Sequence, residues 1–289
     1  MPLFSLLQDN PQVFAILAGI LGLLVGSFLN VVIHRTPIIL MRRWRRDCQE
    51  LVEQTTEPET EKYNLIVPRS RCPHCNHVIR ALENIPVLSY LWLRGKCSSC
   101  AKAISPRYPF VEILSATLSA ICAWHFGFGI AAAAAILLTW ILIALAFIDI
   151  DHLLLPDIMV LPFLWLGLLL NLFNIFTPLP NAVIGAVAGY LSLWLVFHLF
   201  KLITGKEGMG YGDFKLLALF GAWLGWQSLP LIILLSSLIG ALVGIGLIVL
   251  RGRDRAQPLP FGPYLAAAGW VALLWGDVIV RQYLQMARL

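Results

Sequence analysis

Five long runs without a charged residue constrain the fold of this chain more than any other feature. They are residues 14–33, 113–148, 158–200, 216–250 and 256–276. About 20 apolar residues are enough for a helix to cross a bilayer, and the three longest runs are interrupted by FGFG, TPLPN and GWQSLP. With 59% hydrophobic and 13% charged residues, the chain is too apolar for a soluble domain. The sequence predicts an all-α polytopic membrane protein with about eight transmembrane helices.

The distribution of Lys and Arg predicts the orientation of these helices. No basic residue precedes the first run and no small-residue cleavage site follows it, so we expect a retained helix rather than a signal peptide. If that helix enters the cytoplasm, residues 34–107, 201–215 and 251–255 share one side and hold 19 of the 21 Lys and Arg. This asymmetry follows the positive-inside rule. The net charge of +5 therefore reflects orientation, and we expect no nucleic-acid partner.

The same reasoning divides the chain into three parts. Residues 1–33 form an N-terminal transmembrane helix, 34–107 a cytoplasmic domain between helices one and two, and 108–289 a core of seven helices. The cytoplasmic part opens with RRWRRDCQELVEQTTEPETEKY, which predicts a short amphipathic helix and then an acidic linker.

Four cysteines in the cytoplasmic part have the spacing of a metal site. They form two C-x2-C pairs separated by 21 residues: Cys72, Cys75, Cys97 and Cys100. Two such pairs can complete a tetrahedral zinc site, and a disulfide alternative is disfavoured on the cytoplasmic face. Four thiolates leave no open position on the metal, so this pattern predicts one structural zinc rather than a catalytic one.

Few acidic residues lie in or beside the apolar runs, and each is a candidate functional group because ionisable groups there are costly. They are Glu112, Asp149, Asp151, Asp157 and Asp213. Asp157 follows Pro156, so its alternative role is to cap the N-terminus of a helix. The alternative role of Asp151 is that of a polar residue at the membrane interface. Asp149 ends an apolar run and is harder to explain structurally.

Asp213 lies in GMGYGDFK, where three glycines precede the next apolar run. The alternative to a catalytic role is again a helix N-cap. The helix that starts here is short, so its glycine-rich entry is expected to lie packed in protein or beside a wet cavity. Asp149 and Asp213 both fall at the cytoplasmic edge. Two facing carboxyl groups can serve as general base and general acid, which indicates aspartyl peptide hydrolysis.

Seven sequence blocks carry a resemblance to a known family. They are GSFLNVVIHR, PRSRCPHC, ENIPVLSYLWLRGKC, RYPFVEILSA, DIDHLLLPD, GMGYGDFKL and PFGPYLA, and together they span nearly the whole chain. In them the chain resembles the type IV prepilin peptidases, bifunctional leader peptidases and N-methyltransferases of the G-x-G-D aspartyl protease type.

The resemblance implies specific roles. Asp149 and Asp213 would be the aspartyl pair, and the substrates would be type IV prepilins and type II secretion pseudopilins at the bacterial inner membrane. Their basic leader would be removed on the cytoplasmic side, and the new N-terminus methylated with S-adenosylmethionine. Gly95 and Lys96 would belong to the methyl-transfer site, although charge compensation at the zinc thiolates is an alternative role.

Two other function classes are compatible with part of the pattern. A transporter or channel would explain a broken helix and acids within the membrane, but GMGYGDF has no visible inverted-repeat partner. A membrane-tethered zinc-ribbon adaptor would leave Asp149 and Asp213 unexplained.

Overall fold

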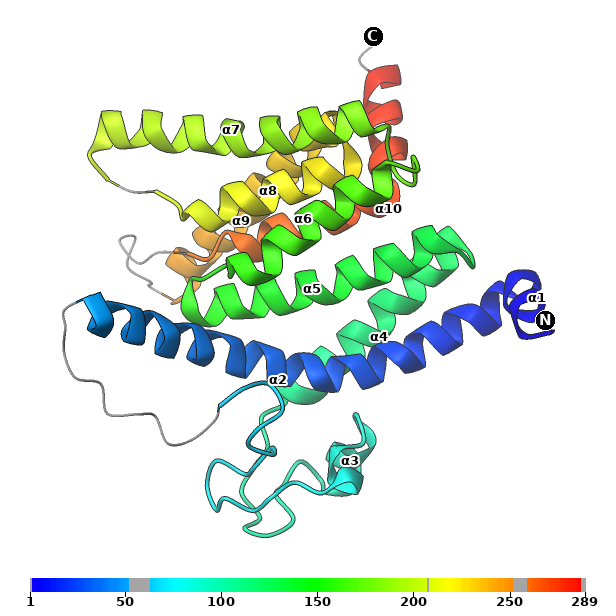
Figure 1. Ribbon diagram of the computed structural model, residues 1–289, viewed down its shortest axis with the longest axis vertical. Helices are drawn as coiled ribbons and strands as arrows, with labels where there is room; N and C mark the ends of the chain where they lie inside the picture. The colour runs from blue at the N-terminus through cyan, green and yellow to red at the C-terminus, as the bar shows by residue number, and fades with distance from the viewer. Residues whose placement is uncertain (1, 52–62, 207, 252–258, 287–289) are drawn as a thin grey trace. The chain divides into compact units, whose positions relative to one another are not determined.

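The computed structural model describes residues 2–51, 63–206, 208–251 and 259–286, and it separates into two compact units, residues 1–128 and 129–289. All regular elements in the described ranges are helical (Figure 1), apart from two isolated β-bridges. Six of the described helices are long and apolar enough to cross a membrane. The prediction of an all-α membrane protein is therefore confirmed. Three features of the sequence analysis lie outside the described residues: the acidic linker, the part of RGRDR that follows its first arginine, and Arg288.

The first unit consists of a helical pair and a loop region. Its elements are α1 (Pro2–Asp9), α2 (Pro11–Leu51), the 3-10 helix η1 (Ala81–Asn84), α3 (Leu88–Trp92) and α4 (Arg107–Phe126). The expected helix at 14–33 does not end where the charges begin, because α2 continues to Leu51 through Pro37. The predicted amphipathic segment is thus the C-terminal part of one 41-residue helix.

Small residues allow α2 to lie against α4. A Cβ placed on Gly22 would stand 2.7 Å from the Ser115 carbonyl oxygen, and one placed on Gly26 would stand 2.7 Å from the Glu112 Cα. These glycines are four residues apart, the spacing that brings two helices into close backbone contact in membranes. The close approach fixes the two helices that carry the loop region.

The second unit is a bundle of six α-helices. They are α5 (Ile130–His152), α6 (Asp157–Asn171), α7 (Leu179–Thr204), α8 (Tyr211–Leu224), α9 (Leu229–Arg251) and α10 (Gly262–Met286), with the 3-10 helix η2 (Trp226–Ser228) between α8 and α9. The breaks predicted at FGFG, TPLPN and GWQSLP all separate helices. Outward side chains such as Trp165, which is 63% exposed, suit a lipid-facing surface.

The short helix α8 is the buried centre of this bundle. It packs against α6, α7, α9 and α10, and most of its side chains from Asp213 to Trp223 are buried. Its 14 residues span about 20 Å at 1.5 Å per residue, less than the roughly 30 Å hydrocarbon core. Burial begins at Asp213, whereas Gly208, Gly210 and Tyr211 before it are exposed. The expectation that the glycine-rich entry lies packed in protein is therefore not confirmed.

Candidate active site and metal centre

Asp149 lies in the last turn of α5 and is 5% exposed. The helix ends just after it, because Leu153 adopts a left-handed conformation (φ 52°) and donates its N–H to the Asp149 carbonyl oxygen. The carboxyl group has a distant partner in sequence: the amide of Gly262, at the start of α10, donates to Oδ2 at 2.9 Å. A Cβ on Gly262 would stand 2.7 Å from that oxygen, so the contact requires glycine.

Asp213 lies in the first turn of α8 and is 6% exposed. Gly210 is the N-cap residue, so the N-cap alternative for Asp213 itself is wrong by three positions. Asp213 still satisfies the helix start, because its Oδ2 accepts the Gly210 amide at 3.2 Å while its own amide donates to the Gly210 carbonyl at 3.2 Å. Its other oxygen, Oδ1, is buried and has no hydrogen-bond partner among the described residues.

The two aspartates belong to one local site. Leu155, in the connection between α5 and α6, lies beside the glycines that flank the two carboxyl groups. A Cβ on Gly212, next to Asp213, would meet the Leu155 side chain at 2.7 Å, and one on Gly262, the partner of Asp149, would meet it at 3.2 Å. The two buried carboxyl groups thus share an apolar wall, and Oδ1 of Asp213 has no hydrogen-bond partner among the described residues.

The remaining acids have other positions. Asp157 is the first residue of α6 after the N-cap Pro156, and it makes no cap, so the N-cap expectation is wrong. Its two oxygens each lie 2.7 Å from Lys215 Nζ on α8. Asp151 is exposed, and Glu112 lies in α4 of the other unit, where it accepts the Val87 amide at 2.7 Å.

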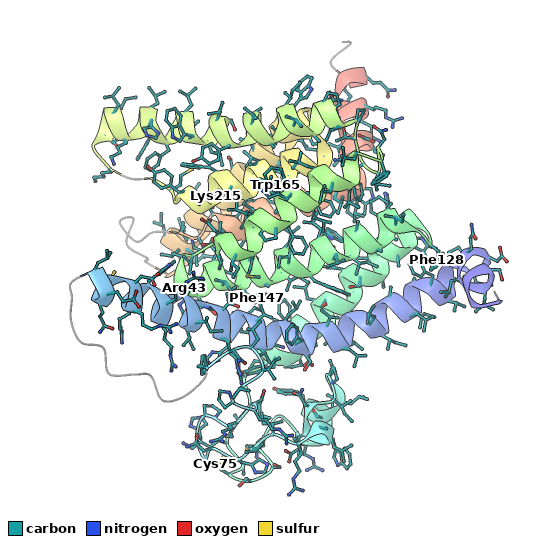
Figure 2. The ribbon with its side chains drawn as sticks, in the orientation of Figure 1. Arg43, Cys75, Phe128, Phe147, Trp165 and Lys215 are labelled. Atoms are coloured by element: carbon teal, nitrogen blue, oxygen red, sulfur yellow. The ribbon has the colours of Figure 1, made fainter. Side chains whose placement is uncertain are left out.

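The four predicted cysteines come together in the loop region of the first unit. Their Sγ atoms all lie within 4.8 Å of one another, and those of Cys72 and Cys100 are 3.9 Å apart. Zn–S bonds of about 2.3 Å in a tetrahedron require sulfur atoms about 3.8 Å apart. The cluster therefore fits a four-thiolate zinc ion, and Cys75 can be found in this region in Figure 2.

The two C-x2-C pairs are held by the same backbone pattern at an offset of 25 positions. Antiparallel bridges close each turn, Arg71 with Val78 and Lys96 with Ala103. The amides of Cys72 and Cys97 donate to His77 and Lys102 carbonyls at 2.9 and 2.8 Å. Asn76 and Ala101 both have φ 55°. The loop region is thus a pair of matching knuckles, a symmetry that the cysteine spacing alone does not specify.

Backbone amides aimed at the thiols favour metal-binding thiolates. The amides of His74 and Cys75 lower the pKa of Cys72 to about 6, and those of Cys100 and Ser99 lower the pKa of Cys97. At Cys100 the Lys102 amide acts in the same direction, but desolvation and the neighbouring thiols raise the pKa to about 11. The four thiols therefore do not all ionise without a cation between them. A bound metal ion would supply that positive charge.

The comparisons with family models and with curated relatives agree on one family. Residues 20–126 match the bacterial peptidase A24 N-terminal domain, and residues 136–245 match the type IV leader peptidase family. The chain belongs to the type IV leader peptidase family. Curated relatives from Stutzerimonas stutzeri, Pseudomonas aeruginosa and Aeromonas salmonicida are named prepilin leader peptidase/N-methyltransferase. They are 59%, 59% and 58% identical over 98%, 99% and 98% of this chain and equal shares of their own lengths. No solved structure matches.

This family is one of aspartic proteases, so membership decides among the three function classes in favour of an enzyme. It also makes Asp149 and Asp213 the natural candidates for the peptidase pair, since they are the buried aspartates of the second unit. The four cysteines and residues 95–96 fall in the N-terminal family domain.

Gly95 and Lys96 lie at the entry to the second knuckle. Gly95 has φ 67°, and a Cβ there would stand 3.0 Å from the Tyr90 hydroxyl. Its carbonyl accepts the Ile104 amide at 2.7 Å. Lys96 forms the closing bridge. Both residues therefore have a structural role, and their part in methyl transfer stays a prediction.

Sequence reasoning missed three residues around the aspartates. Gly262, Leu155 and Lys215 act through contacts between segments far apart in the chain. The sequence signals for Gly262 are its place in the PFGPYLA block and before Pro263, which mark a family motif and a helix start but name no partner.

Proposed function

We propose that this chain cleaves the short basic leader from type IV prepilins and type II secretion pseudopilins and then N-methylates the new N-terminal residue, usually Phe. The relatives' names and the family support both activities. One structural observation supports the peptidase proposal: Asp149 and Asp213 are both buried beside Leu155, and one oxygen of Asp213 has no partner among the described residues.

The chemistry needs one proton shared between the two carboxyl groups. The ionised member takes a proton from water, whose oxygen bonds to the scissile carbonyl carbon, while the protonated member donates its proton to the carbonyl oxygen. When the C–N bond breaks, the leaving nitrogen keeps the bonding pair and takes the proton that the base received from water, giving the mature pilin's amine. The other carboxylate takes a proton from the diol hydroxyl, so that the leader leaves with a carboxyl group and one proton again remains on the pair. Each carboxyl accepts one backbone amide, and the bond to Asp149 is the shorter, at 2.9 Å against 3.2 Å. We therefore assign Asp149 as the ionised base and Asp213, through Oδ1, as the acid.

Leader release from a purified prepilin tests this assignment. Asp149→Asn and Asp213→Asn should each abolish cleavage, because neither remaining carboxyl can be both acid and base. Asp277→Asn is the matched control, since Asp277 is an exposed carboxyl of α10 and should leave the rate unchanged. Cleavage by either active-site variant within about tenfold of the unsubstituted enzyme would contradict a two-carboxyl mechanism.

The zinc site is proposed to be structural. Cys72, Cys75, Cys97 and Cys100 would bind one zinc, which when bound supplies folding energy to the two knuckles.

Methyl transfer would use S-adenosylmethionine and a separate site built partly from residues 34–107. The free amine of the cleaved pilin bonds to the methyl carbon, the carbon–sulfur pair stays on sulfur, and a proton leaves the nitrogen. Asp149→Asn protein should therefore still methylate a pilin supplied already cleaved. Lys96→Ala should lose methyl transfer more than cleavage. Parallel loss of both activities in every variant, with zinc content unchanged, would mean one shared site.

The membrane arrangement is proposed in full as eight crossings of the bacterial inner membrane, namely the six long candidates with α6 and α8. Residues 1–33, 34–107 and 108–289 would be the N-terminal span, the cytoplasmic domain and the lipid-embedded protease core. Cys48 on the extension of α2 is exposed. It should react with a membrane-impermeant maleimide in inverted inner-membrane vesicles and be protected in intact spheroplasts.

A further inference from the structure

The first unit contains a cavity of about 540 Å³ between α2, α4 and the loop region. Ligand pockets of about 300–1,000 Å³ enclose a ligand of drug size. Its wall includes Ser27, Asn30, Tyr63, Tyr90, Tyr108 and Glu112, and it reaches Cys72 and Cys97 of the zinc cluster. The aspartyl mechanism uses no part of this cavity.

Glu112 gives the wall an unusual charge. The residue is 7% exposed, and its carboxyl accepts hydrogen bonds from two neutral groups, the Val87 amide at 2.7 Å and the Ser27 side chain. Burying a carboxylate with neutral partners is costly unless a cation joins it. A cationic ligand in the cavity would remove much of this cost.

The tyrosines suit the same kind of ligand. Tyr90 and Tyr108 come from α3 and α4, whereas the Tyr63 ring already has the guanidinium groups of Arg42 and Arg35 at 4.5 and 5.6 Å from its centroid. Aromatic faces attract cations within about 6 Å and stack on nucleobases. The Glu112 carboxylate and the rings of Tyr90 and Tyr108 are therefore surroundings that suit a sulfonium-bearing nucleoside.

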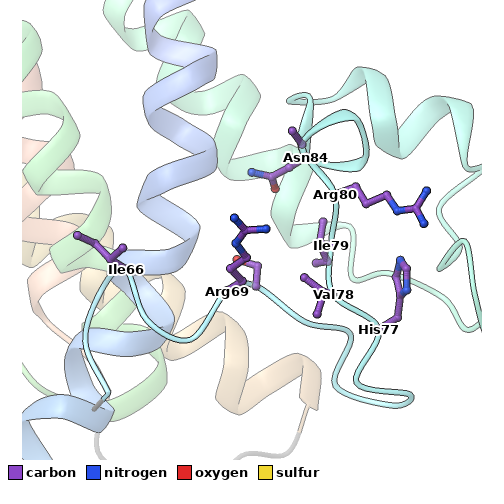
Figure 3. A pocket seen from close by; sticks show the side chains of 9 residues that line it. Ile66, Arg69, His77, Val78, Ile79, Arg80 and Asn84 are labelled. Carbon is purple, nitrogen blue, oxygen red and sulfur yellow. The ribbon is translucent and has the colours of Figure 1, made fainter. Parts of the chain in front are cut away.

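A second hollow in the same unit lacks this chemistry. It measures about 730 Å³ and is lined by Ile66, Arg69, Ser70, His77, Val78, Ile79, Arg80, Ala81 and Asn84 (Figure 3). These residues include two arginines but no carboxylate and no tyrosine. The first cavity is also lined by basic residues, namely Arg35, Arg69, Arg71 and Lys102, but it alone of the two combines them with carboxylates and tyrosines. A donor that carries a sulfonium, a carboxylate and a nucleobase is therefore matched better by the first cavity than by the second.

We infer that the cavity between α2, α4 and the two knuckles binds the sulfonium methyl donor, with Glu112 as the group that recognises its positive charge. This inference rests on the proposed methyltransferase function and assigns it a place. It also gives the predicted role of Gly95 a structural basis, because Gly95 does not line the cavity but a side chain there would push the Tyr90 ring, which does.

Binding measurements on the full-length protein in detergent test the inference. S-adenosylmethionine and S-adenosylhomocysteine differ by one methyl group and by the positive charge on sulfur. Glu112→Gln keeps an acceptor for the Val87 amide and removes only the charge. We expect it to weaken S-adenosylmethionine binding about tenfold or more and S-adenosylhomocysteine binding less than about threefold. Asp47→Asn, an exposed carboxyl elsewhere on α2, should change neither.

Tyr90→Leu provides a second variant and should weaken both ligands, since both carry the nucleoside. Zinc content and leader cleavage report whether each variant is folded. Equal loss of both ligands in Glu112→Gln with zinc retained would overturn charge recognition, and unchanged binding in both variants would overturn the cavity assignment. A failure of the unsubstituted protein to methylate cleaved pilin would instead refute the proposed function, so the two failures are distinguishable.

Discussion

The amide of Gly262 donates a 2.9 Å hydrogen bond to Oδ2 of Asp149, across 113 positions of sequence. The contact places the N-terminus of α10 at the end of α5, and it orients one carboxyl of the proposed pair. Asp213 also accepts one backbone amide, from Gly210 at 3.2 Å, so the two carboxyl groups differ in that the donor to Asp149 comes from a distant helix.

Replacing Gly262 should therefore impair peptide cleavage. In Gly262→Ala the new Cβ would stand 2.7 Å from Asp149 Oδ2, so the carboxyl must move, and we expect kcat for leader release to fall by about tenfold or more. Gly276→Ala is the matched control in the same helix, because its Cβ would lie 3.7 Å from the nearest side chain. Equal rates for the two variants would show that the contact does not matter for catalysis.

The Asp157–Lys215 pair should contribute little to stability. Both side chains are partly exposed, and such pairs are worth about 0–1 kcal/mol. Asp157→Asn and Lys215→Met should each lower the thermal midpoint slightly. Because each single substitution already breaks the ion pair, the double variant should lower the midpoint by less than the sum of the two single effects. Cleavage should stay within about threefold of the unsubstituted rate. A loss as large as that of Asp149→Asn would place Asp157 in the catalytic site.

Zinc binding should depend on each of the four clustered cysteines. Cys97→Ser removes one thiolate, so we expect loss of zinc and protease sensitivity in residues 63–107, with a secondary fall in both activities. Metal analysis of freshly purified protein measures the first effect. Cys48→Ser, outside the cluster, should keep its zinc. Full zinc in the Cys97→Ser variant would exclude the four-thiolate site.

Alanine substitutions at two glycines of α2, three residues apart, should differ in their effect on stability, because only one of the two glycines lies tightly against α4. Gly22→Ala would put a Cβ 2.7 Å from the Ser115 carbonyl oxygen and 2.8 Å from the Ala116 Cα, which are backbone atoms. We expect a loss of about 1–3 kcal/mol, seen as a lower thermal midpoint in detergent. In Gly19→Ala the nearest atoms lie at 3.6 Å, so that variant should be close to neutral. Similar midpoints for both would argue against tight packing here.

Sequence patterns anticipated what depends on local chemistry. The helix breaks followed from Gly and Pro, and the cysteine cluster followed from spacing. The unusual glycine-rich segment before Asp213 marks it as a candidate in the sequence. The structure adds that Oδ2 accepts the Gly210 amide at the start of the helix, whereas Oδ1 has no hydrogen-bond partner among the described residues.

What the sequence could not supply depends on tertiary contacts. The predicted end of the first helix at residue 33 is wrong because charged residues mark the membrane surface and not the end of the helix. The chain beyond Ile33 has no helix-breaking signal strong enough to stop the helix, which continues through Pro37. The pairing of Glu112 with Val87 and of Gly262 with Asp149 joins residues 25 and 113 positions apart, and neither has a local pattern.

The unbroken helix α2 has a mechanical consequence. Its 41 residues extend about 60 Å at 1.5 Å per residue, twice the thickness of the hydrocarbon core. Arg35, near its middle, donates to the carbonyls of Asn64 and Pro68 at 2.9 and 2.6 Å, which ties the loop region to the rod. The segment around Asn64 and Pro68 is thus attached directly to the helix that starts in the apolar run, and a change in the tilt of that helix would move the attachment point with it.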